Sequence, residues 1–180
     1  LIEARSLAMQ KAAENSSGAM FAIIGSTPAD IEKVCAETEG YVVPVNYNSS
    51  VQTVIAGEEA AAQAAADTLA AAGARAIRLN VAAAFHSKLM QGAADEFKPA
   101  AEQISFKTPE ITMLSNISGT VLDSIDNMPE RLALHIVSPV KFTSELAYLS
   151  ENGYDTFIEC GPGKVLTGLV KKTLKGVNAM

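Results

Sequence analysis

Residues 41–56 read YVVPVNYNSSVQTVIA, and this stretch predicts the central hairpin of a lobe. Val and Tyr favour strands and make up most of residues 41–47, and residues 51–56 are also largely apolar and β-branched. The polar residues Asn48-Ser49-Ser50 lie between these segments and are typical of a turn. Two strands that are separated by so short a turn predict a β-hairpin.

The segments on either side of this hairpin complete a compact pattern. Thr27 followed by Pro28 is typical of a helix start, and Gly40 and Gly73 are typical helix ends. We therefore expect a strand at residues 19–25, a helix at 27–38, a helix at 57–72 and a strand at 74–81. The resulting order, βαββαβ, predicts a ferredoxin-like small lobe over residues 18–82.

Residues 1–17 and 83–180 are expected to form a second lobe, in which helices alternate with strands. We expect strands at residues 111–116 and 154–160, and helices at 127–136, 141–151 and 164–174. A further helix should follow residue 86, with Pro99 kinking or splitting it. Because strands that alternate with helices usually lie parallel, this region predicts part of an α/β lobe with a parallel sheet.

The composition excludes several classes of protein. The chain has 180 residues, is 48% hydrophobic and has a formal net charge of −6, so it is globular and lacks the basic surface that nucleic-acid binding requires. No apolar stretch approaches the roughly 20 residues of a membrane span. Its two cysteines, Cys35 and Cys160, are too few for a disulfide framework, which favours a cytoplasmic setting.

The first 13 residues read as the middle of an amphipathic helix. No capping residue or turn precedes Leu1, and charges at Glu3 and Arg5 exclude a signal peptide. We therefore expect that sequence upstream of Leu1 is missing.

His86 is the first candidate for chemistry, since it lies where an apolar strand gives way to a helix. A histidine there can act as a general base near neutral pH, although a capping or packing role is the alternative. Arg5 lies among apolar neighbours, where its guanidinium could grip a carboxylate through two parallel hydrogen bonds, or could simply be a surface group.

Other polar residues carry weaker signals. Asn46 and Asn48 could hydrogen-bond a ligand or shape the hairpin. Residues 161–164, Gly-Pro-Gly-Lys, lack the spacing of a phosphate-binding loop and predict a tight strand-to-helix turn. Cys160 could form a nucleophilic pair with His86, but a small buried apolar role is the commoner state. Two His and two Cys in separate regions predict no metal site.

Six segments together resemble the family of malonyl-CoA:acyl carrier protein transacylases, over essentially the whole chain. These segments are residues 2–10 (IEARSLAMQ), 44–49 (PVNYNS), 54–57 (VIAG), 84–90 (AFHSKLM), 138–140 (SPV) and 159–166 (ECGPGKVL). The resemblance implies an α/β-hydrolase-like lobe with a ferredoxin-like lobe inserted.

The resemblance also implies a two-step acyl transfer without a cofactor, from malonyl-CoA through an acyl-serine to the phosphopantetheine thiol of acyl carrier protein. In it His86 is the catalytic base and Arg5 holds the malonyl carboxylate. Phe85 limits branched acyl groups and Asn48 contacts substrate. His135 stands where the family usually has Gln, and its main-chain carbonyl orients the catalytic His.

One family motif is missing, because no G-x-S-x-G nucleophile elbow occurs in the 180 residues. The chain alone is therefore expected to be inactive, as removal of a serine nucleophile costs about a million-fold in turnover. Two alternatives stay open. The chain could be a non-catalytic module that binds malonyl-CoA or carrier protein, or it could belong to the acyltransferase domain of a polyketide synthase.

Overall fold

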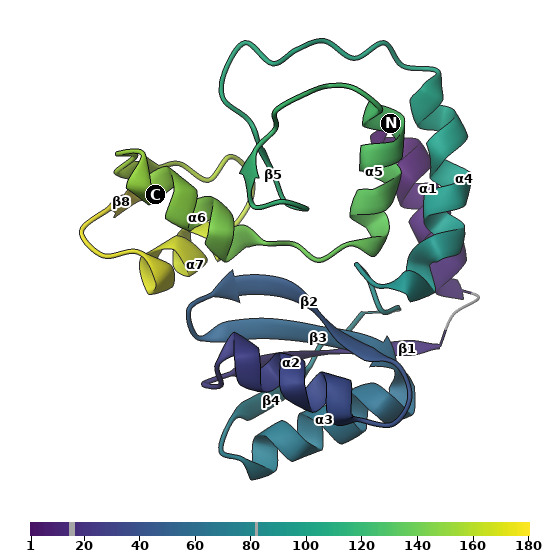
Figure 1. Ribbon diagram of the computed structural model, residues 1–180, viewed down its shortest axis with the longest axis vertical. Coiled ribbons are helices and arrows are strands. Elements are labelled where there is room, and N and C mark those ends of the chain that lie inside the picture. The colour runs from purple at the N-terminus through teal and green to yellow at the C-terminus, as the bar shows by residue number, and fades with distance from the viewer. Residues whose placement is uncertain (15–16, 82) are drawn as a thin grey trace.

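The smaller lobe is a four-stranded antiparallel sheet with two helices on one face (Figure 1). The computed structural model describes residues 1–14, 17–81 and 83–180. The elements of this lobe are β1 (Gly18–Ile24), α2 (Pro28–Glu37), β2 (Val42–Ser49), β3 (Gln52–Glu58), α3 (Glu59–Ala71) and β4 (Arg75–Arg78). The strand order is β2-β3-β1-β4, which is that of the predicted ferredoxin-like unit.

Strand β1 is buried on both faces, and its alternating side chains explain how the lobes join. Phe21 and Ile23 lie in a core with residues of α2 and α3. Met20 and Ala22 point to the opposite face and pack with Ala84, which belongs to the segment that leads to residue 86. Because successive side chains of a strand alternate between faces, one strand supports both the helix layer and the second lobe.

The start of α2 follows the sequence signal. The Thr27 side chain accepts a hydrogen bond of 3.2 Å from the main-chain N–H of Asp30, and Pro28 occupies the first helical position. This cap satisfies a donor that the helix start leaves without a partner.

The second lobe contains mostly helices. Its elements are α1 (Ile2–Glu14), the 3₁₀ turn η1 (Lys88–Met90), α4 (Gln91–Glu102), β5 (Leu114–Ser115), β6 (Thr120–Val121), α5 (Met128–Val137), α6 (Phe142–Glu151), β7 (Thr156–Phe157), α7 (Val165–Thr173) and β8 (Asn178–Ala179). Helices α1, α4 and α5 pack together around Ala8, Phe97 and Ile136, while α6 and α7 lie on the other side of the lobe (Figure 1). The α/β class predicted from sequence is confirmed, whereas the proposed boundaries of the two lobes stay a prediction, with Ala82 outside the described residues.

Several expected elements differ from those observed. The strands expected at 111–116 and 154–160 shrink to β5 and β7, and β5 pairs antiparallel with β6. Within the described ranges, β7 and β8 form the one parallel pair of strands. A strand needs neighbouring strands to hydrogen-bond its backbone along its whole length. The side chains of Ile111 and Ile158, outside β5 and β7, are 82% and 68% exposed, so these parts of the two segments lie at the surface. Pro99 does not split the helix, since α4 continues to Glu102, whereas a kink at Pro99 stays a prediction.

Candidate active site

His86 occupies a strained turn at the junction of the two lobes. Its φ angle is 60°, in the left-handed region that side chains other than Gly rarely adopt. The buried Ser87 hydroxyl holds this turn from inside, donating to the Ala84 carbonyl over 2.6 Å and accepting from the Leu89 N–H over 3.2 Å. Such strain persists only where surrounding contacts over-determine the conformation, and it is commonest at functional sites.

The ring of His86 is oriented by the main chain of α5. Its Nδ1 lies 3.2 Å from the carbonyl oxygen of His135. A carbonyl can only accept a hydrogen bond, so Nδ1 carries the proton and Nε2 presents a free lone pair. This arrangement suits a general base, and it is the contact that an orienting role for the His135 carbonyl requires.

Burial and positive charge keep both imidazoles neutral. Burial lowers the pKa of His86, the Arg5 charge lowers it further, and hydrogen bonds to the His135 and Ser138 main chain partly oppose this. Burial, His86 and Arg5 together lower the pKa of His135 to about 4. At neutral pH both rings are therefore uncharged, and His86 can accept a proton.

Arg5 lies close enough to both imidazoles for its positive charge to lower their pKa values. It projects from α1, is half-buried, and burial lowers the pKa of its guanidinium. Over the ranges 1–14, 17–81 and 83–180, no hydrogen bond or ion pair engages that guanidinium. A partly buried, always charged fork without an internal partner is suited to an anionic ligand.

The two other predicted site residues differ in their setting. Phe85 packs against the apolar clusters of both lobes, directly beside His86. Asn48 is half-buried near the end of β2, and no contact among the described residues joins its side chain to His86. The structure thus brings Arg5, Phe85, His86 and the His135 carbonyl together, and places Asn48 on the strand whose outer edge bonds to Val140.

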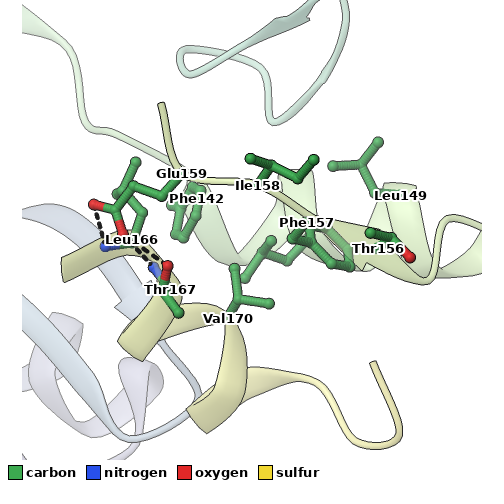
Figure 2. Close-up of a pocket in the computed structure, with 10 residues that line it drawn as sticks. Phe142, Leu149, Thr156, Phe157, Ile158, Glu159, Leu166, Thr167 and Val170 are labelled. Carbon is green, nitrogen blue, oxygen red and sulfur yellow. Dashed lines mark hydrogen bonds between the residues drawn. The ribbon is translucent and has the colours of Figure 1, made fainter. Parts of the chain in front are cut away.

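The predicted turn at residues 161–164 serves α7. Gly161 and Gly163 have positive φ angles, and the Glu159 carboxylate accepts hydrogen bonds from the N–H groups of Leu166 and Thr167 (Figure 2). Glu159 belongs to an apolar pocket of about 290 Å³ between α6, β7 and α7 that contains none of the predicted site residues. Its carboxylate is committed to the helix start, so this pocket offers no free charged group.

The remaining sequence candidates stay apart from His86. Cys160 is exposed and free, and no contact of the described residues joins it to His86. Cys35 is buried and its pKa is raised to about 12, so its thiol stays protonated. Among residues that the structure describes, no group of three or more His, Cys, Asp or Glu could hold a metal ion, and no helix is long and apolar enough to cross a membrane.

Sequence reasoning missed two polar residues near the site and one buried carboxyl on α6. Ser87, directly after His86, could have been recognised as a turn-forming serine. Tyr41 contacts Lys88 across the lobe boundary, and buried Glu145 accepts two hydrogen bonds of 3.1 Å from Asn116. Separations of 47 and 29 residues in the chain leave no local pattern from which these contacts could be inferred.

Comparison with known proteins identifies the class of this chain. The family described as acyl transferase domain matches residues 2–180, so the chain belongs to the acyl transferase family. It is 39% identical to the malonyl CoA-acyl carrier protein transacylase of Escherichia coli K12 over 99% of its own length and 59% of that protein. The resemblance to malonyl transacylases that the sequence motifs indicated is thereby confirmed.

Solved structures give the same result. The malonyl CoA-acyl carrier protein transacylase of Clostridium perfringens superposes with a TM-score of 0.93 at 36% identity, covering 98% of this chain and 57% of that one. A malonyl-transacylase in complex with a type II PKS acyl-carrier protein gives 0.92 at 36% identity, covering 99% and 59%. The chain thus spans less than two thirds of the length of these relatives.

Proposed function

We propose that this chain supplies the base and the carboxylate clamp of a malonyl-CoA:acyl carrier protein transacylase. The observation that carries the proposal is the hydrogen bond of 3.2 Å from His86 Nδ1 to the His135 carbonyl, since it leaves Nε2 free to take a proton. The family membership and the malonyl transacylases among the relatives support the substrate class.

In the proposed reaction a serine hydroxyl attacks the malonyl thioester while His86 Nε2 takes its proton. The leaving thiolate of CoA then takes that proton, and a malonyl-serine ester remains. In the second half, the phosphopantetheine thiol of acyl carrier protein gives its proton to Nε2 and attacks the ester, and the serine oxygen recovers the proton. No cofactor takes part, and His86 returns to its starting state after each half-reaction.

The serine is absent from the 180 residues, which contain no G-x-S-x-G motif. We therefore propose that His86 acts on a serine supplied from outside them and that the chain alone does not transfer malonyl groups. Arg5 would hold the malonyl carboxylate, Phe85 would limit the bulk of the acyl group, and Asn48 would contact the substrate from β2.

A fusion tests this function. The part of the Escherichia coli relative that this chain does not match, which should carry the serine elbow, is joined ahead of Leu1, and transfer from malonyl-CoA to acyl carrier protein is measured. We expect transfer by the fusion and none by the chain alone. His86→Ala in the fusion should lower turnover by about a million-fold.

Two results would argue against the proposal. A folded fusion that transfers no malonyl group would remove the transacylase function from this chain. A His86→Ala fusion that forms malonyl-serine at the unsubstituted rate would remove His86 from the chemistry.

A non-catalytic binding module is the second candidate, because the base and clamp occur here without the serine motif. In that case the chain alone should bind malonyl-CoA, and Arg5→Ala should abolish binding without any acyl-enzyme forming. Calorimetry measures binding of malonyl-CoA and of acetyl-CoA, which lacks the carboxylate. Tighter binding of malonyl-CoA supports this candidate, and a chain that binds neither ligand excludes it.

A further inference from the structure

We propose that Tyr41 of the small lobe is a positioning residue that holds the His86 turn in its working conformation. The importance of that conformation rests on the proposed function, whereas the contacts that fix it are properties of this chain. Tyr41 lies 45 residues before His86 in the chain, immediately before β2.

The backbone of Tyr41 is anchored to β3 on both sides. Its N–H donates to the Glu58 carboxylate over 3.2 Å, and its carbonyl accepts from the Glu58 N–H over 2.8 Å. The adjacent Gly57 approaches so closely that a Cβ there would lie 2.1 Å from the Tyr41 carbonyl oxygen. Tyr41 is therefore fixed to the sheet, and its side chain extends from a rigid support.

That side chain makes two contacts with Lys88, the first residue of η1. The Tyr41 hydroxyl accepts a hydrogen bond of 3.1 Å from the Lys88 main-chain N–H, and the Lys88 ammonium lies 3.9 Å from the centre of the phenol ring. The first N–H groups of a helix have no acceptor within the helix, and the Tyr41 hydroxyl accepts the hydrogen bond of one of them, that of Lys88. The cation–π contact holds the ring over the same turn.

These contacts complete the support of His86. Ser87 ties the turn to the Ala84 carbonyl from inside, and Tyr41 ties it to the small lobe from outside. Both ties are needed, because the φ angle of His86 is 60° and a residue with a side chain is more stable at negative φ. Without the outer tie, the turn can relax and carry the ring away from the His135 carbonyl.

Tyr41→Phe isolates the hydroxyl, since it removes the acceptor and keeps the ring for Lys88. The matched control is Tyr47→Phe, which also removes a hydroxyl of the small lobe, one that donates to Glu32 over 2.7 Å. The chain has two histidines, so each imidazole is resolved by NMR in a titration of the isolated chain. Thermal unfolding of each variant monitors the fold separately.

We expect the titration midpoint of His86 to fall by a few tenths of a pH unit in Tyr41→Phe. The bond from Nδ1 to the His135 carbonyl stabilises the charged ring, so lengthening it lowers the pKa. Exchange of the Lys88 amide should become up to roughly tenfold faster. Tyr47→Phe should change neither value, and Lys88→Met, which removes the cation–π contact and keeps the main-chain N–H, should shift the midpoint less than Tyr41→Phe does.

The proposal is overturned if Tyr41→Phe folds and leaves the His86 midpoint unchanged, or if Tyr47→Phe shifts it equally. If Tyr41→Phe does not fold, amide exchange in the unsubstituted chain decides: a Lys88 amide that is protected from exchange supports the tie to the Tyr41 hydroxyl, and one that exchanges as fast as in an unstructured peptide overturns it. These readouts need no acyl transfer, so they are independent of whether the fusion supports the transacylase function.

Discussion

The imidazole rings of His86 and His135 lie with their centres 5.5 Å apart and their planes tilted by 52°. At this separation a proton on one ring disfavours a proton on the other, so the two groups titrate as a pair. His86 is the member with a hydrogen bond to stabilise its charged form, and His135 Nε2 is buried without a hydrogen-bond partner in the part of the chain that the structure describes. The first proton taken up by the pair therefore belongs on His86.

The tautomer of His86 can be observed directly. At neutral pH we expect nitrogen NMR to show Nδ1 protonated and Nε2 unprotonated, because Nδ1 faces the His135 carbonyl. The two nitrogen shifts distinguish the tautomers, and His135 in the same spectrum provides an internal reference. A spectrum with the proton on Nε2 would contradict the free lone pair on which the base role depends.

His135 should make the fold sensitive to acid. Its pKa is lowered from 6.5 to about 4 in the folded chain, so the unfolded chain binds more protons between these values. Its contribution to stability is present above about pH 6.5 and is lost as pH falls toward about 4, amounting to about 1–2 kcal/mol after solvent screening.

Urea unfolding at several pH values compares the chain with His135→Gln, which keeps the main-chain carbonyl and cannot be protonated. The free energy of unfolding of the variant should fall less steeply with acid over this window. Parallel pH profiles for the two proteins would show that His135 titrates normally in the fold.

Glu145 should act in the opposite direction. Its carboxyl is buried, and burial raises its pKa from 4.5 to about 7 despite two hydrogen bonds from Asn116. The folded state thus favours the protonated form, and the stability that this gives is full below about pH 4.5 and is lost as pH rises toward about 7.

Glu145→Gln should therefore raise the free energy of unfolding by about 1–3 kcal/mol above pH 7 and change it little at acid pH. Glu151→Gln, an exposed position on the same helix, is the control and should change the profile little at any pH. A variant that is less stable than the unsubstituted chain above pH 7 would mean that Glu145 is charged and well paired in the fold.

Arg5→Ala should discriminate between acyl donors. In the fusion described above, it should lower kcat/KM for malonyl-CoA by about 10–100-fold, the cost of losing a charged hydrogen-bond partner. Transfer from acetyl-CoA, which has no carboxylate, should change little. Equal losses for both donors would assign Arg5 to folding rather than to the clamp.

The small lobe could be predicted almost completely from the sequence, because its signals are local. The Thr27 cap, the Gly40 and Gly73 helix ends and the hairpin turn each act over a few residues, although the turn lies at residues 50–51 instead of 48–50, because β2 continues to Ser49. The second lobe was predicted less well, since the length of β5 and β7 depends on which segments lie beside them. The composition of a segment such as residues 154–160 indicates a strand but does not identify the neighbouring strands with which it must pair.

The candidate site also contains residues that the sequence indicates and residues that it does not. His86 and Arg5 were found because their chemistry is unusual for their surroundings. The orienting carbonyl at His135 came from resemblance, since any residue type can offer a main-chain oxygen. Tyr41 gave no signal, because its role depends on an approach between lobes that no spacing in the chain encodes.

The contact between Val140 and β2 has a consequence for solubility. Strand β2 forms one edge of the four-stranded sheet, and an edge strand exposes hydrogen-bonding groups that can recruit another chain. Val140 pairs with this edge, accepting from the Tyr47 N–H over 2.9 Å and donating to the Val45 carbonyl over 2.8 Å. The segment around Val140 therefore occupies part of this edge of the sheet and blocks intermolecular strand pairing there.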